Sequence, residues 1–186
     1  VDAGRLGHPG PLELVDIDIL KGESRSEDFL RRNPNGRVPM VEFEDGRILA
    51  ESNAIMFYLA EGTPLLPEDR FARAQALQWM FFEQYSHEPY IAVARFWHSI
   101  KPGGREEKKD RFPEWHERGY QALAVMERHL SAREWFAGDD CSIADIALYA
   151  YTHVAHEGGF DLSPYGAIKG WMARLSAQPN HVPMDW

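Results

Sequence analysis

Two short motifs in the first third of the chain carry residue types that suit the binding of a small charged molecule. The run N-P-N-G-R-V-P-M over residues 33–40 enters a strand-like segment, where an X-Pro bond at Pro39 can be cis and turn the main chain of Val38 toward a ligand. Glu51 and Ser52 stand between a strand and a helix, and the free N–H groups of a helix N-terminus favour a carboxylate or a phosphate. Each motif also has a purely structural interpretation, with Pro39 as the first residue of a strand and Ser52 as a plain helix N-cap.

The segments around these motifs predict a small α/β unit. Residues 14–19 alternate apolar and acidic side chains, as a half-buried strand does. Residues 26–32 favour a short helix, which the following Asn-Pro-Asn-Gly cluster ends. Residues 40–43 and 47–49 predict a hairpin, in which Asp-Gly supplies the positive φ angles of a tight turn. Apolar residues then recur at helical spacing from Ser52.

The rest of the chain predicts only helices. The long helical stretch over residues 71–100 contains Pro89, which kinks or splits a helix because its ring clashes with the preceding turn. Three further helices are expected over residues 113–130, 142–156 and 164–177. The chain is therefore interpreted as an α/β domain followed by an all-α domain. The expected boundaries are residues 1–62 for the first domain, 63–69 for a linker and 70–186 for the second domain.

Composition excludes several classes of protein. The chain has 186 residues, with 20 Lys and Arg against 29 Asp and Glu, and this net charge of −9 disfavours nucleic acid and anionic membranes as partners. The one cysteine, Cys141, permits no intramolecular disulfide and no cysteine-built zinc site, so a reducing cytoplasm is the expected location. No apolar run approaches the roughly 18 residues of a membrane span. Residues 1–11 do not have the pattern of a signal peptide.

Two smaller clusters have structural interpretations. Ser142 and Asp145 have the spacing of a capping box ahead of a helix, and Cys141 is expected to pack beside it rather than to act as a nucleophile. His153 and His156 can share a helix face, but no third ligand accompanies them, so no metal site is expected.

The two motifs and their surroundings resemble a known family. The runs N-P-N-G-R-V-P at residues 33–39 and D-G-R-I-L-A-E-S-N-A-I at residues 45–55 are similar to the glutathione-binding half of bacterial cytosolic glutathione transferases. The capping box at Ser142 and Asp145 is similar to one in the helical domain of that family. The resemblance implies a thioredoxin-like α/β N-terminal domain followed by an all-α helical bundle.

The resemblance also implies a binding role for each residue of the two motifs. Val38, next to a cis Pro39, would pair its main chain with the cysteinyl part of glutathione, as one strand pairs with another. Ser52 would hold the α-carboxylate of the γ-glutamyl end at the helix N-terminus, and Glu51 would face the amino group of that end. Arg37 would meet the glycyl carboxylate.

The implied reaction is attack of the glutathione thiolate on a small hydrophobic electrophile, in a homodimeric enzyme with glutathione as co-substrate. In the family the long helix lines the pocket for the second substrate, which indicates Tyr85, Tyr90 and Trp97 here, although residues at such spacing more often form a core or an interface. The same helix also carries His87, Arg95 and His98. The alternatives are a non-catalytic binding module and a glutathione-dependent isomerase, reductase or dehalogenase, because a fold does not fix its chemistry.

The sequence departs from the family ahead of residue 14. The resemblance implies that a strand, a loop with a catalytic Tyr, Ser or Cys, and a helix come first, and such a unit needs about 25 residues. Residues 1–11 are too few to hold it, and Gly-His-Pro at residues 7–9 resembles the end of its helix. We therefore expect a longer polypeptide, whose intact mass exceeds 21.3 kDa by about 2–3 kDa, and no catalytic residue is assigned.

Overall fold

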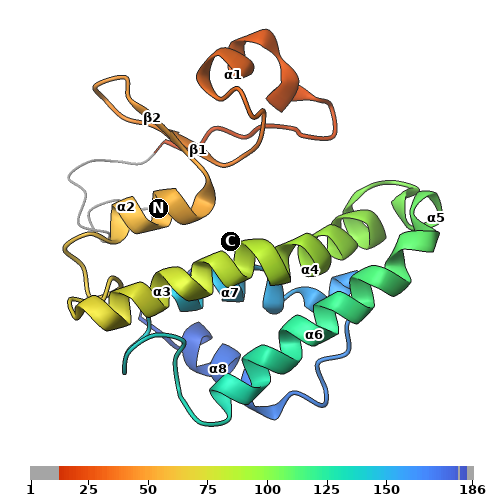
Figure 1. Cartoon of the computed structure of the whole chain (residues 1–186). Coiled ribbons are helices and arrows are strands. Elements are labelled where there is room, and N and C mark those ends of the chain that lie inside the picture. Colours follow the sequence, from red (N-terminus) through yellow and green to blue (C-terminus); the bar gives the residue numbers. More distant parts are fainter. Residues whose placement is uncertain (1–12, 180, 184–186) are drawn as a thin grey trace. The chain divides into compact units, whose positions relative to one another are not determined.

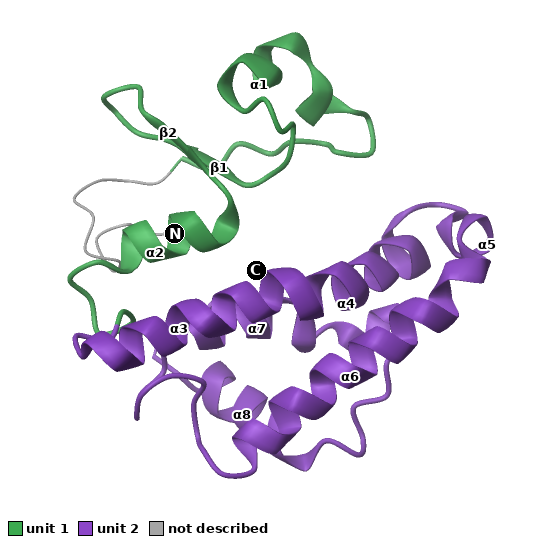
Figure 2. Ribbon diagram, viewed as in Figure 1, with its two compact units in different colours: residues 1–66 green, residues 67–186 purple. Residues whose placement is uncertain are grey.

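The structure is a computed structural model that describes residues 13–179 and 181–183. The chain forms two compact units, residues 1–66 and residues 67–186 (Figures 1 and 2). The first unit contains helices and a small sheet, and the described part of the second contains helices without a strand. The prediction of an α/β part followed by an all-α part is confirmed.

Unit 1 is built around one hairpin and two helices. Helix α1 (Glu27–Arg32) begins after Ser26, whose Oγ accepts a hydrogen bond from the N–H of Phe29 at 3.2 Å. Strands β1 (Met40–Glu42) and β2 (Ile48–Ala50) pair antiparallel. Helix α2 (Ser52–Ala60) follows β2 after one residue.

The turn of the hairpin uses one positive φ angle. The N–H of Phe43 donates to the carbonyl of Arg47 at 2.9 Å, and Gly46 has a φ of 80°. Asp45 keeps a negative φ and instead accepts the N–H of Arg47 on its Oδ1 at 3.0 Å. The hairpin is therefore confirmed, but the expectation of a positive φ at Asp45 is wrong, because its carboxylate closes the turn.

The strand predicted over residues 14–19 is not formed. Leu14 and Val15 are 62% and 71% exposed, and the sheet among the described residues has only β1 and β2. A single extended segment without a paired neighbour is not stable in water. Asp18 also ends the extended run, because its Oδ1 accepts the N–H groups of Leu20 and Lys21 at 3.0 Å each. The strand, loop and helix expected ahead of this segment, and the resemblance at residues 7–9, fall outside the described residues.

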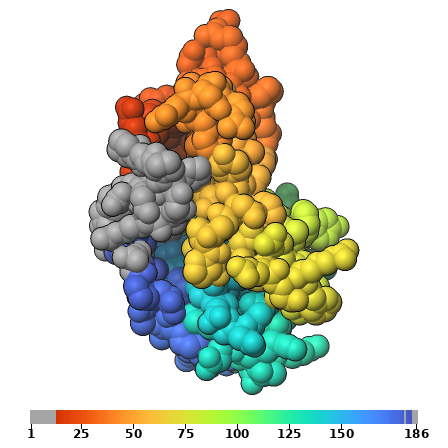
Figure 3. Space-filling view, turned by 90° about the vertical axis from the view of Figure 1, so that its left-hand side faces the viewer, coloured from red at the N-terminus to blue at the C-terminus, as the bar shows by residue number. Residues whose placement is uncertain are grey.

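Unit 2 begins with one long, interrupted helix. Helix α3 (Arg70–Phe82) runs into a π-helical turn (Glu83–His87), and helix α4 (Glu88–Arg95) runs into a second π turn (Phe96–Ile100). The predicted break at Pro89 is thus a change of helix type, because proline has no N–H to continue the α-helical pattern. The α3 segment lies on the surface of unit 2, in yellow in Figure 3.

Four more α-helices among the described residues complete unit 2. They are α5 (Gly104–Glu107), α6 (Phe112–Leu130), α7 (Ile143–Thr152) and α8 (Gly166–Ser176). The helix predicted over residues 142–156 is shorter, and a separate 3-10 turn (Ala155–Gly158) follows it. The core includes Ile91, Leu123, Met126, Leu148 and Trp171, all fully buried. Helix α6 comes close to this core at Gly119, where a Cβ would lie 2.5 Å from the ring of Phe160.

The predicted capping box at the start of α7 is present. Ser142 Oγ accepts the N–H of Ala144 at 3.3 Å, and Asp145 Oδ2 accepts the N–H of Ser142 at 2.9 Å. Asp145 reaches further than a local cap, because its Oδ1 also accepts the indole N–H of Trp171 at 2.9 Å and the N–H of Phe136 at 3.1 Å. One buried carboxylate therefore joins α7 to α8 and to the loop before α7.

Two absences concern only the described part of the chain. None of its helices has both the length and the apolar character that crossing a membrane requires. Residues 13–179 and 181–183 also contain no group of three or more His, Cys, Asp or Glu side chains placed to hold a metal ion.

Candidate functional site

The register of the hairpin brings the two motifs of the sequence together. Met40 pairs with Ala50, so Val38 and Pro39, just before β1, and Glu51 and Ser52, just after β2, extend from the same end of the hairpin. The Val38–Pro39 peptide bond is cis, as expected. Both motifs therefore lie at one end of the hairpin, where β1 begins and β2 passes into α2.

The loop before Val38 is held by a buried asparagine. Asn33 is only 5% exposed, and its side-chain amide donates to the carbonyl of Arg37 at 2.7 Å. Its side-chain oxygen accepts the N–H of Asn35 at 3.2 Å. Asn33 thus fixes the main chain directly ahead of Val38. In the sequence Asn33 is recognisable only as part of a helix-ending cluster, and no local signal reveals its positioning role.

The entry to α2 departs from the predicted cap. Glu51 is the N-cap residue, with a φ of 73° and no side-chain bond to the helix, and its carbonyl accepts the N–H of Ile55 at 2.9 Å. Ser52 is the first helical residue, so the prediction of Ser52 as N-cap is wrong. A left-handed φ is costly for a residue with a side chain, and it turns the chain sharply from β2 into α2.

Asn35 orients the Glu51 carboxylate. Its side-chain amide donates to Glu51 Oε1 at 3.3 Å, and its carbonyl accepts a bond from Arg25 Nη1 at 3.0 Å. The asparagine is therefore held from one side by Arg25 while it contacts Glu51 on the other. This contact spans 16 positions in sequence, and no local pattern could have identified it.

Several polar groups at this end of the hairpin are open. Among the residues that the structure describes, the main-chain N–H and C=O of Val38 and the hydroxyl of Ser52 have no hydrogen-bond partner, and Arg37 has no ion pair. Val38 is 44% exposed, which leaves its main chain accessible. The site thus offers a free strand edge, a helix N-terminus, one carboxylate and one guanidinium. That set suits an extended peptide with both an ammonium and carboxylates.

The structure does not gather the three aromatic residues predicted for a second-substrate pocket into a groove of unit 2. Tyr85 is 84% exposed on the first π turn, and Tyr90 is half-buried on α4. Trp97 lies in the second π turn, with Lys108 Nζ 4.8 Å from its ring centre. None of the three lines either of the two grooves described in unit 2. Their role as a pocket stays a prediction.

The remaining candidates are not placed for catalysis. Burial, together with the charges of Asp145 and Asp140, raises the pKa of the Cys141 thiol to about 12, so the thiol stays protonated at neutral pH. His153 stacks on Tyr149 and its Nδ1 lies 2.7 Å from the carbonyl of that residue, while His156 is exposed. These environments agree with the structural interpretation of Cys141, His153 and His156.

Comparison with known proteins places the chain in a family. The model of the glutathione S-transferase N-terminal domain matches residues 11–61, and that of the C-terminal domain matches residues 76–179. A disulfide-bond oxidoreductase of Escherichia coli, YfcG, is 30% identical over 173 residues, which is 89% of this chain and 79% of that protein. The chain belongs to the glutathione S-transferase family, and its fold is the thioredoxin-like and all-helical pair of domains of that family.

Solved structures of glutathione transferases are also similar to this chain. A glutathione S-transferase from Pseudomonas fluorescens shares 56% sequence identity with a TM-score of 0.87, over 90% of this chain and 83% of that one. A glutathione transferase from Burkholderia graminis shares 27% identity with a TM-score of 0.76, over 91% of this chain and 75% of that one. The latter holds two glutathione molecules per subunit.

Proposed function

We propose that the chain binds glutathione at the end of the hairpin, through Arg37, Val38, Pro39, Glu51 and Ser52, and presents its thiolate to a small hydrophobic electrophile. The observation that supports the proposal is the pairing of Met40 with Ala50, which brings the open main chain of Val38 and the uncapped start of α2 to the same end of the hairpin. Family membership supports glutathione as the ligand.

Each part of glutathione has a chemical partner in this arrangement. The α-carboxylate of the γ-glutamyl end takes the hydroxyl and N–H of Ser52, where the helix dipole favours a negative charge. The ammonium of the same end faces Glu51, which Asn35 holds in place. The cysteinyl amide and carbonyl pair with Val38 as an added strand. The glycyl carboxylate meets Arg37.

The proposed reaction forms one bond and breaks one. The thiolate sulfur attacks an electrophilic carbon, a C–S bond forms, and the leaving group departs with the electron pair of the broken bond. Tyr85, Tyr90 and Trp97 remain the residues that we propose for the electrophile pocket. The group that lowers the pKa of the glutathione thiol, ordinarily about 8.5 for a free thiol, is not assigned to any described residue.

The second candidate is the glutathione-dependent reduction of a disulfide, which the printed name of YfcG favours. In that reaction two glutathione thiols are oxidised to one glutathione disulfide, and the substrate disulfide gains two electrons and two protons. Cys141 takes no part, because its thiol stays protonated. Glutathione itself would supply both reacting sulfurs.

One set of measurements separates these activities. We expect calorimetry to show saturable glutathione binding, and turnover of chlorodinitrobenzene with glutathione to identify a transferase. Turnover of hydroxyethyl disulfide instead would identify the reductase. Binding without either activity would leave an isomerase, a dehalogenase or a non-catalytic binding module. Absence of glutathione binding would overturn the proposed site.

We also propose a homodimer in a reducing cytoplasm. Phe71 and Phe81 on α3 are each 71% exposed, and large exposed aromatic side chains are typical of interfaces. We expect light scattering on the purified protein to give twice the chain mass, and Phe81→Ser to shift it toward the monomer. A monomeric wild-type protein would contradict the dimer.

A further inference from the structure

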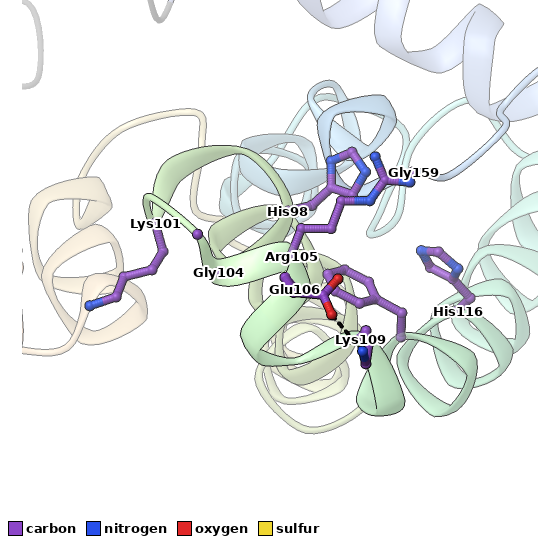
Figure 4. Close-up of a pocket in the computed structure, with 10 residues that line it drawn as sticks. His98, Lys101, Gly104, Arg105, Glu106, Lys109, His116 and Gly159 are labelled. Carbon is purple, nitrogen blue, oxygen red and sulfur yellow. Dashed lines mark hydrogen bonds and ion pairs between the residues drawn. The ribbon is translucent and has the colours of Figure 1, made fainter.

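A second candidate site lies in unit 2, away from the hairpin motifs in sequence. A surface groove of about 660 Å³ is lined by residues from the end of the second π turn, the segment around α5, the start of α6 and the turn after Ala155–Gly158. Figure 4 shows His98, Arg105, His116 and Gly159 around this space. Nothing in the hairpin site uses these residues.

The walls of the groove are tied together by hydrogen bonds. The Ser99 hydroxyl donates to the carbonyl of Glu157, and the Arg95 Nε donates to the Glu157 carboxylate at 2.6 Å. On the other side, His116 Nε2 lies 2.9 Å from the carbonyl of Gly158. Both helices that flank the groove are therefore fixed to the same 3-10 turn.

Gly159 keeps one wall of the groove free of side chains. Its φ is 87°, and a Cβ at this position would lie 3.2 Å from His116 Nε2. A larger residue would be strained in this conformation and would press against the imidazole. The backbone and the imidazole can therefore stay close together.

The hydrogen bonds define which imidazole nitrogens are open. A carbonyl can only accept, so His116 Nε2 carries a hydrogen, and in the neutral ring the free lone pair is then on Nδ1. The Ser99 hydrogen is used on Glu157, so Ser99 Oγ accepts from His98 Nδ1 at 3.1 Å, and in the neutral ring the lone pair is then on His98 Nε2. Both rings lie 5.8 Å, centre to centre, from Phe112. Two hydrogen-bond acceptors thus flank an aromatic surface.

One guanidinium in the groove has no counter-charge. Around it, Lys109 pairs with Glu106, Lys108 with Glu107, and Arg111 with Glu114. Arg105 has no ion pair or hydrogen bond among the described residues. In Figure 4 its side chain extends toward His98 and Gly159, whereas Lys101 points away. Arg105 therefore leaves an uncompensated positive charge beside two histidines, although the chain as a whole has a net charge of −9.

We propose that this groove binds a small aromatic phosphate monoester. The planar guanidinium of Arg105 suits two phosphoryl oxygens, and Phe112 offers a surface for the organic ring. The second pKa of a phosphate monoester is about 6, so a fraction of the ligand keeps one P–OH near neutral pH, and that group can donate to an open imidazole nitrogen. A carboxylate at the same pH has no proton to donate, which is why we favour the phosphate.

Calorimetry with phenyl phosphate tests the proposal. We expect one saturable site per chain, about tenfold or more weaker binding in Arg105→Ala, and an intermediate loss in Arg105→Lys, which keeps the charge without the planar fork. The matched control is Arg118→Ala, which removes an exposed arginine from α6 with the same change in charge. Its affinity should stay within about twofold of the wild type.

Four outcomes would overturn the proposal. Equal losses in Arg105→Ala and Arg118→Ala would indicate diffuse charge. Displacement of phenyl phosphate by glutathione would place the probe in the hairpin site, and benzoate binding as tightly as phenyl phosphate would remove the case for a phosphate. Absence of any saturable binding would exclude the site. Thermal unfolding of each variant confirms that it is folded, and imidazole resonances of His98 and His116 should shift on binding.

Discussion

The N-termini of helices α7 and α2 differ in whether side chains of the chain itself cap them. At the start of α7, Ser142 accepts the N–H of Ala144 and Asp145 accepts the N–H of Ser142, and both residues are almost fully buried. At the start of α2, Glu51 makes no side-chain bond to the helix, and the Ser52 hydroxyl has no partner among the described residues. Every helix begins with N–H groups that need partners.

The α7 terminus contributes to folding, whereas the α2 terminus is available for ligand binding. The α7 terminus is capped by side chains of the chain itself, so it stabilises unit 2. The α2 terminus is open and lies at the same end of the hairpin as the open main chain of Val38, so its partners must come from water or a ligand.

Asp145→Asn should give the largest loss of stability. An amide nitrogen would face donors that now bind the carboxylate, including the indole of Trp171, and buried donors without partners are costly. We expect the free energy of unfolding, measured with urea, to fall by about 3 kcal/mol. The matched control is Asp140→Asn, an exposed position where the loss should stay below about 0.5 kcal/mol. Equal losses in the two variants would show that the capped α7 terminus contributes little.

His87 should make unit 2 sensitive to acid. It is fully buried, with Nε2 2.9 Å from the hydroxyl of Thr152, and burial lowers its pKa from 6.5 to about 3. As pH falls below 6.5, the unfolded chain takes up this proton and the folded chain does not, so stability present above pH 6.5 is lost progressively toward pH 3.

The loss from this one group should be about 2–3 kcal/mol between pH 7 and pH 4.5. Urea titrations of His87→Gln at the two pH values should show a smaller difference than the wild type. His156→Gln, which removes an exposed histidine, should retain the wild-type difference. The prediction fails if both variants respond to acid alike.

Replacing the serine at each of the two helix N-termini with alanine tests the difference between them directly. Ser52→Ala should weaken glutathione binding by about 2 kcal/mol and leave stability nearly unchanged, because its hydroxyl makes no cap bond. Ser142→Ala should lower stability by about 1 kcal/mol and leave glutathione affinity unchanged. Calorimetry and urea unfolding of both variants provide the four values. A Ser52→Ala variant that loses only stability would make Ser52 a structural residue.

Asn35→Ala should have the smallest effect. Removing its bond to Glu51 frees the carboxylate, and we expect glutathione affinity to fall by about 0.5–1 kcal/mol. The control is a double-mutant cycle with Glu51→Gln. If Asn35 acts through Glu51, its replacement should matter less in that background, whereas a full additive loss would assign it a direct contact with the ligand.

Sequence patterns predicted those elements that depend only on residues close together in the sequence. The short helix that begins after Ser26, the hairpin turn at Gly46 and the interruption near Pro89 each follow from residues within a few positions of one another. The capping box of α7 belongs to the same group, as does the cis bond at Pro39. These features depend on backbone preferences that the residue type sets by itself.

The errors and omissions concern distant partners. Alternation at residues 14–19 predicts a strand only if a neighbouring strand is available, and the described residues contain none for it. The contact of Asn35 with Glu51 and the groove between His98 and Gly159 join positions far apart in sequence. Ser52 has the residue type of a cap, but the left-handed φ of Glu51 moved the cap by one position.

The hairpin register has a practical consequence for engineering. Because Met40 pairs with Ala50, one residue inserted within either strand would change this register and reverse the faces of that strand. Residues 33–52, which include Asn33 and Asn35, should therefore be grafted into another scaffold only as one continuous segment. Length changes confined to the turn at residues 44–46 should be the tolerated ones, which makes that turn the place to attach a label or an affinity tag.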